Sequence, residues 1–197
     1  MPNASKPEST AGLKRTVVLV GLMGAGKSTV GRRLADRLGV RFVDSDSEIE
    51  TAADMTISEI FERFDEAYFR DGERRVIARL LNDKPCILAT GGGAFLSNEN
   101  REMIGKSGIS VWIKVDLETL WERVKDKDSR PLLNGDDPKG VLTRLLEARY
   151  PLYGTAEIVV NSASGDPHEV VVNAIVAALE GGGYLPATGG NEDKHEH

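Results

Sequence analysis

The fold is decided by the stretch Gly21-Leu22-Met23-Gly24-Ala25-Gly26-Lys27-Ser28, which matches G-x-x-x-x-G-K-[ST] at every fixed position. Residues 16–20, just before it, are apolar and β-branched, as in a buried parallel strand. After it, Val30, Leu34 and Leu38 recur every four positions, as on one face of a helix. Strand, glycine-rich loop and helix together predict backbone N–H groups arranged around a polyphosphate at a helix N-terminus.

The residue types in this loop suit phosphate chemistry. Its glycines let the backbone approach phosphates without a Cβ in the way. Lys27 can neutralise charge on β- and γ-phosphates, and the Ser28 hydroxyl can ligate Mg²⁺. A chance glycine turn before a helix is the alternative, and the strand and helix patterns on either side argue against it.

Composition narrows the class of protein. A chain of 197 residues with 40% hydrophobic and 28% charged residues is typical of one soluble globular domain. The net charge of -6, without a basic stripe, argues against a nucleic-acid partner. No run of about 18 apolar residues is present, so we expect no membrane partner. The single cysteine, Cys86, lies in an apolar run, which predicts a buried reduced thiol. Residues 1–15 lack the apolar segment of a secretory signal. Together these two features predict a cytoplasmic location.

Strand patterns and helical patterns alternate along the chain. The strand patterns cover 16–20, 41–44, 86–89, 110–115 and 157–160. Such alternation predicts an α/β fold with three layers, a mostly parallel sheet covered by helices on both faces.

We expect one domain over residues 15–180, with a disordered polar leader at 1–14 and a disordered tail at 181–197. One segment, residues 125–140, is dense in charge, glycine and proline, and a loop longer than about 12 residues is usually a lid or another functional segment. Its Arg130 could fold over bound phosphates. A solvated surface loop is the alternative that the pattern leaves open.

Two local patterns predict where helices begin. Thr56 and Glu59 have the spacing of a capping box. Asp166 and Pro167 suit the N-cap and first turn of a last helix that ends near Leu179.

A pair of carboxylates ends the second strand pattern. In open α/β sheets, ligands bind beyond the carboxyl ends of strands, and Asp44 and Asp46, two apart on a strand, would point to the same side. One could hold Mg²⁺ through water while the other accepts a hydroxyl proton. The alternative is that one or both begin the following helix.

Glycines and arginines complete a candidate pocket. The run Thr90-Gly91-Gly92-Gly93 follows the strand pattern at 86–89, so a small ligand could press against bare backbone, although a flexible turn is the alternative. Arg70 stands three residues before Glu73 on a helical face, and Arg149 lies at the end of another helix. Guanidinium groups grip carboxylates bidentately, which suggests a hydroxylated acid as the ligand.

In their order and spacing these motifs resemble the shikimate kinase family of P-loop kinases, over residues 15–179. The phosphate loop alone is unspecific among P-loop proteins, whereas the whole set is very specific. The set comprises the loop at 21–28, Asp44-Ser45-Asp46, Phe69-Arg70 with Glu73, Thr90-Gly91-Gly92-Gly93, Arg130-Pro131-Leu132-Leu133, and Arg149 with Pro151 and Tyr153.

The resemblance implies a P-loop kinase fold with a five-stranded parallel sheet in the order 2-3-1-4-5 and a lid. It also implies ATP-dependent phosphorylation of the 3-hydroxyl of shikimate, in the route to chorismate and the aromatic amino acids, with one Mg²⁺ ion as cofactor. The implied partners are ATP and shikimate, and we expect a monomer.

The resemblance assigns roles residue by residue. It implies catalytic roles for Lys27, Asp46 and Arg130. The implied ATP-binding residues are Gly24, Ala25, Gly26, Lys27, Ser28, Thr29, Arg130 and Pro167, and the implied Mg²⁺ ligands are Ser28 and Asp44. The implied shikimate-binding residues are Asp46, Arg70, Glu73, Gly91, Gly92, Gly93 and Arg149. By the same resemblance, Pro167 would pack on adenine. Members of this family often have an arginine that stacks on the base. In this chain Arg123 or a nearby lysine would have to take that place, and the assignment stays open.

Two other functions are compatible with a phosphate loop. One is a kinase of another small polyol acid such as gluconate, and the glycine run with the Arg70 and Arg149 pair favours shikimate over it. The other is a non-catalytic P-loop binding module, which would tolerate loss of Lys27, Asp46 or Arg130, yet all three are present.

Overall fold

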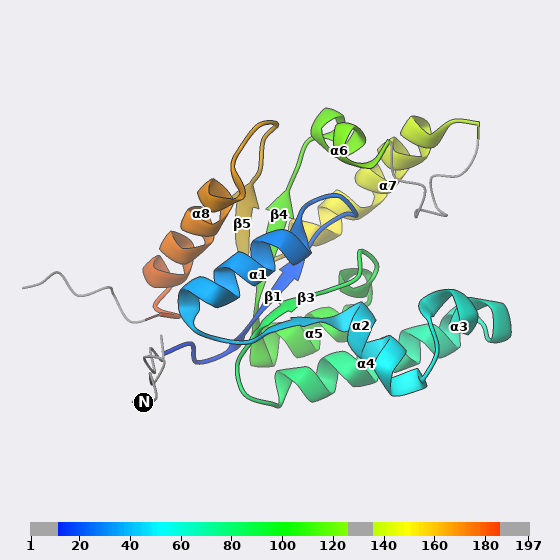
Figure 1. Ribbon diagram of the computed structural model, residues 1–197, viewed down its shortest axis with the longest axis horizontal. Helices are drawn as coiled ribbons and strands as arrows, with labels where there is room; N and C mark the ends of the chain where they lie inside the picture. Colours follow the sequence, from blue (N-terminus) through cyan, green and yellow to red (C-terminus); the bar gives the residue numbers. More distant parts are fainter. Residues whose placement is uncertain (1–11, 126–135, 186–197) are drawn as a thin grey trace, which may run out of the picture.

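The computed structural model describes residues 12–125 and 136–185. Strands and helices alternate through these residues (Figure 1). The strands are β1 (Thr16–Val20), β2 (Phe42–Asp44), β3 (Ile87–Ala89), β4 (Gly108–Lys114) and β5 (Ile158–Asn161). The helices are α1 (Lys27–Leu38), α2 (Ser45–Ala53), α3 (Ile57–Arg63), α4 (Glu66–Leu81), the short 3-10 helix η1 (Ala94–Leu96), α5 (Asn98–Ser107), α6 (Leu117–Val124), α7 (Pro138–Tyr153) and α8 (His168–Gly181).

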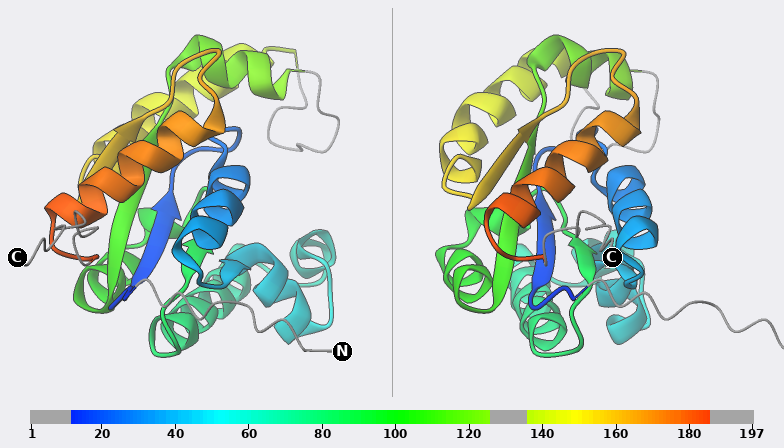
Figure 2. Two further views of the ribbon diagram at one scale, coloured as in Figure 1. Left: turned by 60° about the vertical axis from the view of Figure 1, so that its left-hand side comes forward. Right: turned by 90° about the vertical axis from the view of Figure 1, so that its left-hand side faces the viewer.

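The strands form one parallel sheet in the order β2-β3-β1-β4-β5, which confirms the fold class and the strand order implied by the family resemblance. The central strand is β1, in which Val18 pairs with Leu88 of β3 and Ser110 of β4. Helices α1 and α8 pack side by side on one face of the sheet, and α5 and α7 lie on the other (Figure 2). The result is a three-layer α/β/α arrangement whose strands all end at the same edge.

The core forms where the apolar patterns predicted it. All five residues of β1 are buried, and so are Val30, Leu34 and Leu38 along α1. Burying a side chain of this size contributes about 1.5–3 kcal/mol relative to leaving it in water. The buried strand and the apolar stripe of α1 therefore fix the loop between them at the carboxyl edge of the sheet.

Helix capping agrees with the sequence at α3 and differs at α8. The capping box of Thr56 and Glu59 is formed, as predicted. At α8 the prediction is wrong by one residue: Pro167 is the N-cap and the helix begins at His168. The Asp166 carboxylate instead accepts a hydrogen bond from the backbone N–H of Ala163, at 2.7 Å, so it closes the preceding turn.

The packed domain extends slightly past the boundaries expected from the sequence. Leu13 and Leu185 are buried, at 8% and 6% exposed, although the first was assigned to the leader at 1–14 and the second to the tail at 181–197. The rest of the expected tail from residue 186 on, and residues 1–11 of the leader, lie outside the described residues.

Most of the expected lid at 125–140 also lies outside the described residues, Arg130 included. Its last residues are described and belong to α7, which begins at Pro138. The side chain of Asp137 caps that helix by accepting a hydrogen bond from the N–H of Gly140, at 2.9 Å.

Two findings bear on the composition argument. Cys86 is a free thiol and fully buried, as its apolar surroundings predicted. Within the described part of the chain, no helix combines the length and the apolar character needed to cross a bilayer.

Candidate active site

The phosphate loop depends on glycines at two positions. Gly24 and Gly26 have φ angles of +80° and +91°, which side-chain-bearing residues rarely adopt. A Cβ on Gly24 would also lie 2.6 Å from a methyl group of Val124 in α6. Gly26 is the N-cap of α1, so the loop passes directly from the end of β1 into the N-terminus of that helix.

Lys27 and Ser28 follow as the first residues of α1. The Lys27 ammonium donates hydrogen bonds to the carbonyls of Gly21 and Leu22, at 2.8 and 3.0 Å. The Ser28 hydroxyl donates to Asp44 Oδ2 at 3.1 Å. The loop thus holds its cation against its own backbone and its hydroxyl against the carboxylate that ends β2.

The two aspartates are not arranged as the strand pattern predicted. β2 ends at Asp44, whose Oδ1 accepts from the backbone N–H of Asp46 at 3.1 Å and so caps α2. Asp46 therefore lies in the first turn of a helix, not two residues along a strand, and the prediction of a shared strand face is wrong. Both carboxylates nevertheless reach the same cleft.

The Asp46 carboxylate is largely buried beside another acid. Burial raises the pKa of Asp46, the nearby Asp44 charge raises it further, and Lys27 opposes both. Its Oδ1 is buried without a hydrogen-bond partner among the described residues. A Cβ on Gly91 would lie 2.7 Å from that oxygen, so only glycine leaves room beside it.

The glycine run forms the wall opposite Asp46. The Gly91 N–H donates to the Ser45 hydroxyl at 3.2 Å, which ties the run to the start of α2. The Gly92 carbonyl accepts from Arg149 Nη1 at 3.3 Å and from the hydroxyl of Tyr153. The structure therefore brings Asp46, the glycines and Arg149 together, as the sequence predicted.

Two acidic side chains of α4, the helix that carries Arg70, bind its guanidinium group. Its Nη1 donates to Glu73 at 2.9 Å, and its Nε and Nη2 each lie 3.3 Å from Glu66. Glu73 is 1% exposed, and burial raises its pKa while the ion pair with Arg70 lowers it. A Cβ on Gly93 would stand 2.6 Å from the Arg70 guanidinium, so this cation lies against the glycine run.

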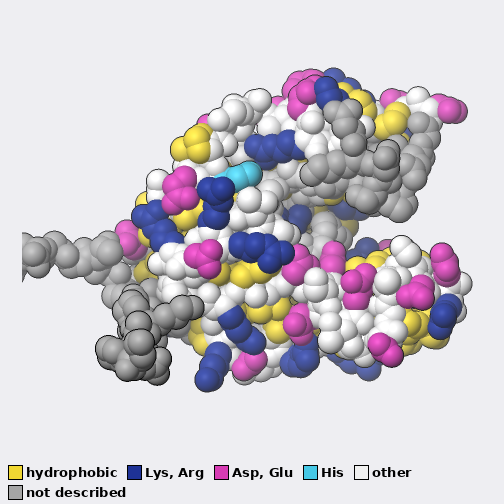
Figure 3. Space-filling model, viewed as in Figure 1, with side chains coloured by type: hydrophobic (Ala, Val, Ile, Leu, Met, Phe, Trp, Pro, Cys, Tyr) yellow, Lys and Arg dark blue, Asp and Glu magenta, His cyan; other side chains and the backbone are white. Residues whose placement is uncertain are grey.

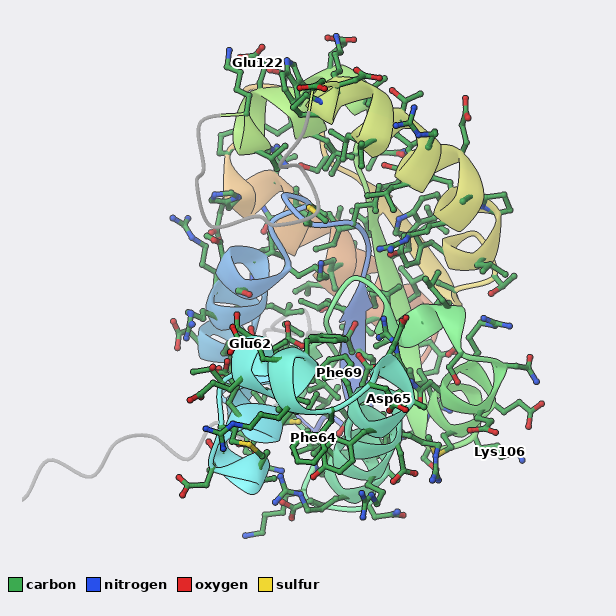
Figure 4. All side chains as sticks on the ribbon, turned by 90° about the vertical axis from the view of Figure 1, so that its right-hand side faces the viewer. Glu62, Phe64, Asp65, Phe69, Lys106 and Glu122 are labelled. Atoms are coloured by element: carbon green, nitrogen blue, oxygen red, sulfur yellow. The ribbon has the colours of Figure 1, made fainter. Side chains whose placement is uncertain are left out.

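Phe69 sets the position of Arg70 at the start of α4. The Phe69 ring is buried where α3 meets α4 and contacts Phe61, with ring centroids 4.9 Å apart (Figure 4). The Arg70 guanidinium carbon lies 5.1 Å from the centroid of the Phe69 ring. Neighbouring residues of a helix project about 100° apart, so the side chain after Phe69 leaves the core, and at Arg70 it lies against Gly93.

Most of these groups line two hollows, and the neighbouring residues Gly92 and Gly93 belong to one hollow each. On the face in Figure 3, the surface is cut back between the part that carries α6 and α7 and the part that carries α2 to α4. The first hollow, of 710 Å³, is lined by Met23, Gly24, Gly26, Lys27, Ser28, Thr29, Asp44, Asp46, Thr90, Gly91, Gly92, Arg123 and His168. The second, of 810 Å³, includes Arg70, Glu73 and Gly93.

Four of the predicted residues are not among the groups that line these hollows, and one of them, Ala25, is buried within the loop at 2% exposed. Arg149 reaches the site through its contact with Gly92. Pro167 is the N-cap of α8, one residue before His168. Arg130 lies outside the described residues, so its role stays a prediction.

The structure adds residues that the motifs did not single out. His168 begins α8 and lines the first hollow, where its ring lies 4.0 Å from the position of a Cβ on Gly26. Arg123 of α6 donates to Ser162 at 3.2 Å, to the Ala163 carbonyl at 3.3 Å and to the Gly24 carbonyl at 3.5 Å. Arg123 was left open as a base-stacking candidate, and no sequence signal pointed to His168 beyond its place after Pro167.

Fold and site together define a P-loop kinase: a parallel sheet, a phosphate loop at its central strand, and a carboxylate facing that loop. The family model for shikimate kinase matches residues 23–180, and the chain belongs to this family. A shikimate kinase of Ruegeria pomeroyi is 59% identical over 169 residues, which cover 86% of this chain and 87% of the relative. A solved structure of shikimate kinase from Acinetobacter baumannii in complex with shikimate is 39% identical, covers 85% of this chain and 94% of its own, and superposes with a TM-score of 0.78.

The runner-up activity has only a distant structural counterpart. A gluconokinase from Sinorhizobium meliloti superposes with a TM-score of 0.56 at 17% identity, covering 85% of this chain and 93% of its own. Similarity at that level shows a shared fold alone. It gives no support to gluconate as the acceptor.

Proposed function

We propose that this chain transfers the γ-phosphoryl group of ATP to the 3-hydroxyl of shikimate, giving shikimate 3-phosphate and ADP. The observation that carries the proposal is the position of Asp46. Its buried carboxylate has one oxygen without a partner among the described residues and lies between the Lys27 loop and the glycine run. An acceptor hydroxyl placed there faces both a base and the phosphate to be transferred.

Asp46 acts in this proposal as the base. It accepts a hydrogen bond from the acceptor hydroxyl, orients its oxygen towards the γ-phosphorus and takes the proton as the new bond forms. The raised pKa of Asp46 brings this carboxyl closer to the working pH, which improves a general base as long as the group remains ionised.

Lys27 and the loop amides hold the phosphates. The Lys27 ammonium, which donates to the carbonyls of Gly21 and Leu22, would also donate to phosphate oxygens, where charge grows during transfer. Arg130 completes the cradle in the proposal, on the strength of the resemblance alone.

Arg70 and Arg149 flank the glycine run and would grip the acid. Their guanidinium groups reach Gly93 and Gly92, two adjacent residues of the pocket wall. Shikimate carries a single fixed charge, its carboxylate, so two planar forks can set the orientation of the ring. In this arrangement Glu73 positions Arg70 and does not itself contact the carboxylate.

The residues present fit one Mg²⁺ ion. Ser28 and Asp44 offer oxygen donors 3.1 Å apart beside the phosphate loop, and Mg²⁺ prefers oxygen ligands, keeping several waters and substrate phosphates in its shell. The described residues hold no group of three or more His, Cys, Asp or Glu side chains suited to a metal, which agrees with an ion bound chiefly through the nucleotide. Bound Mg²⁺ neutralises charge that develops on the β- and γ-phosphates.

We further propose that the enzyme works as a monomer in the cytoplasm, with ATP and shikimate as its partners and without nucleic acid. The buried thiol of Cys86 and the net charge of -6 support this setting. Both halves of the candidate site come from one chain, so a second copy is not required to complete it.

A coupled assay of ADP release tests the proposal. Shikimate, gluconate and nucleoside monophosphates are compared as acceptors at equal concentrations with MgATP. We expect turnover with shikimate and at most trace turnover with the others. Preferential turnover of gluconate would replace shikimate with the runner-up acceptor, and no turnover with any of them would support a non-catalytic module.

A further inference from the structure

The last turns of α7 carry two side chains that converge on one carbonyl. Arg149 and Tyr153 are four residues apart, so they lie on the same face of the helix. The Gly92 carbonyl accepts from Arg149 Nη1 at 3.3 Å and also from the Tyr153 hydroxyl. A carbonyl oxygen has two lone pairs, and here both are used by donors from the same helix.

The side chain of Tyr153 is buried in the core of the domain. It is 0% exposed, and its ring packs 6.0 Å from Trp112 and 6.3 Å from Tyr150, centroid to centroid. A hydroxyl at such a depth costs free energy unless it is hydrogen-bonded, and its bond here is to the substrate wall. A phenol keeps its proton at neutral pH and is a donor there, and burial raises the pKa of Tyr153 still further from that range.

Tyr150, one turn earlier, attaches the same helix to a different place. Its hydroxyl donates to the carbonyl of Val115, just past β4, and its ring meets Trp112 edge-on at 4.9 Å. Burial raises the pKa of Tyr150 to about 12. Tyr150 therefore fastens α7 to the sheet without touching the glycine run, which makes it a matched comparison for Tyr153.

The peptide that Tyr153 holds joins two glycines in the turn before η1. Gly92 is followed by Gly93, so neither neighbour of their shared peptide has a Cβ to restrict rotation. The turn at this point is closed by the Ala94 N–H, which donates to the Gly91 carbonyl at 3.1 Å, and the two bonds to the Gly92 carbonyl hold the same peptide from the side of α7. Of the two donors, the Tyr153 hydroxyl is the one fixed by a buried ring, because Arg149 is only half-buried.

We infer that Tyr153 is a positioning residue for acid recognition: its hydroxyl fixes the Gly92 carbonyl, and that carbonyl holds the Arg149 guanidinium in place for the carboxylate of the acceptor. This inference rests on the proposed function. It assigns two roles to Tyr153: the first is in substrate selection, through the hydroxyl, and the second is in the packing of the core, through the ring. The same geometry gives Tyr150 only the second role, in the packing of the core.

The test compares Tyr153→Phe with Tyr150→Phe, which each remove one hydroxyl and keep the ring. For Tyr153→Phe we expect the KM for shikimate to rise about 3- to 10-fold, the effect of one lost hydrogen bond, with kcat and the KM for ATP within about twofold of wild type. For Tyr150→Phe we expect the KM for shikimate to stay unchanged while the unfolding temperature falls. Should Tyr153→Phe not fold, Tyr153→Met fills the space with a flexible side chain and is expected to show the same rise.

Two further measurements separate positioning from a loss of packing. In an Arg149→Ala background, Tyr153→Phe should add little to the KM, because the group it positions is gone. With a shikimate analogue whose carboxylate is replaced by a neutral hydroxymethyl group, Tyr153→Phe should match wild type. Additive effects in the double variant, or an equal loss with the neutral analogue, would overturn the inference.

The outcomes also distinguish this inference from the proposed function. A folded wild type that does not phosphorylate shikimate overturns the proposed function and the inference with it. A wild type that does so, with a KM for shikimate that Tyr153→Phe leaves unchanged, overturns the inference alone.

Discussion

At Asp46 the proposed catalysis and the stability of the fold make opposite demands on one residue. Its carboxylate is largely buried, stands near the Asp44 charge and leaves one oxygen without a partner among the described residues. Each of these features disfavours the ionised form in the folded chain, yet the proposed reaction needs that form. Lys27 provides the compensating charge.

Asp46→Asn is therefore expected to stabilise the protein while abolishing most of its activity. The folded-state pKa of Asp46 is raised, so the folded chain binds this proton more tightly than the unfolded chain does. Wild type consequently loses stability as pH rises through the unfolded and then the folded pKa, and remains less stable above both. Turnover of the variant should fall by about 10²–10⁴, the usual contribution of a general base.

Thermal unfolding across a pH series measures the stability effect. The variant should unfold at a higher temperature than wild type at neutral pH, and the gap should close as pH falls below the ordinary aspartate range. Asp36→Asn, on the exposed face of α1, is the control and should behave as wild type. Equal unfolding temperatures of Asp46→Asn and wild type at every pH would show that the ionised Asp46 carboxylate does not destabilise the folded chain.

Lys27 gives a second prediction at the same scale. Because its ammonium would stabilise charge on the transferred phosphoryl group, Lys27→Ala should lower kcat by about 10²–10³ at saturating ATP. Lys106→Ala removes the same charge from the exposed end of α5 and should leave kcat unchanged. Near-normal turnover of Lys27→Ala would show that Lys27 does not stabilise the transferred phosphoryl group, and the proposed role of the phosphate loop would be wrong.

At the scale of elements, the ends of helices decide where the site residues fall. Asp44 was predicted to share a strand face with Asp46, but an aspartate is also a good N-cap, and its hydrogen bond to the Asp46 N–H starts α2 at once. The sequence offered that alternative, in which one or both aspartates begin the following helix, but alternation along a strand cannot decide between the two. Asp166 was misplaced for a similar reason, because its side chain closes a turn before α8 and leaves the cap to Pro167.

The start of α8 supplies a prediction that belongs to this scale. His168 lies beside the phosphate loop, so its ring can donate a hydrogen bond to the nucleotide. His168→Ala should raise the KM for ATP about 3- to 10-fold and leave the KM for shikimate unchanged. Initial rates at varied ATP and fixed saturating shikimate measure the effect.

The next residue of α8 provides the control. Glu169 is exposed and pairs with Arg33 and Arg37 of α1, at 3.7 and 3.4 Å, away from the cleft. Glu169→Ala should therefore leave both KM values as they are. If both variants weaken ATP binding equally, the effect comes from the packing of α8 on α1 and His168 does not contact the nucleotide.

For the whole molecule, sequence reasoning succeeded where local pattern and family resemblance reinforced each other. The apolar run of β1, the loop glycines and the stripe of α1 form a contiguous unit, and its place in the sheet followed from the implied strand order. The Arg70 and Glu73 pair, three residues apart on one helix, was equally local and is formed at 2.9 Å. Contacts of this kind can be read from spacing alone.

The parts that sequence reasoning missed join distant segments. The bond from Tyr153 to Gly92 spans 61 residues, and the bonds from Arg123 to Gly24 and to Ser162 span 99 and 39. Such contacts depend on how α6 and α7 pack against the ends of the strands, which no local pattern encodes.

The hydrogen bonds that Lys27 makes to Gly21 and Leu22 have a practical consequence for work at the bench. Since these bonds keep the ammonium beside the loop amides that would hold phosphates, any small tetrahedral oxyanion that fits the loop becomes a rival of the nucleotide. Phosphate and sulfate buffers are thus expected to make ATP look like a poorer ligand than it is. Amine or zwitterionic buffers with chloride as counterion are the suitable media for measuring its affinity.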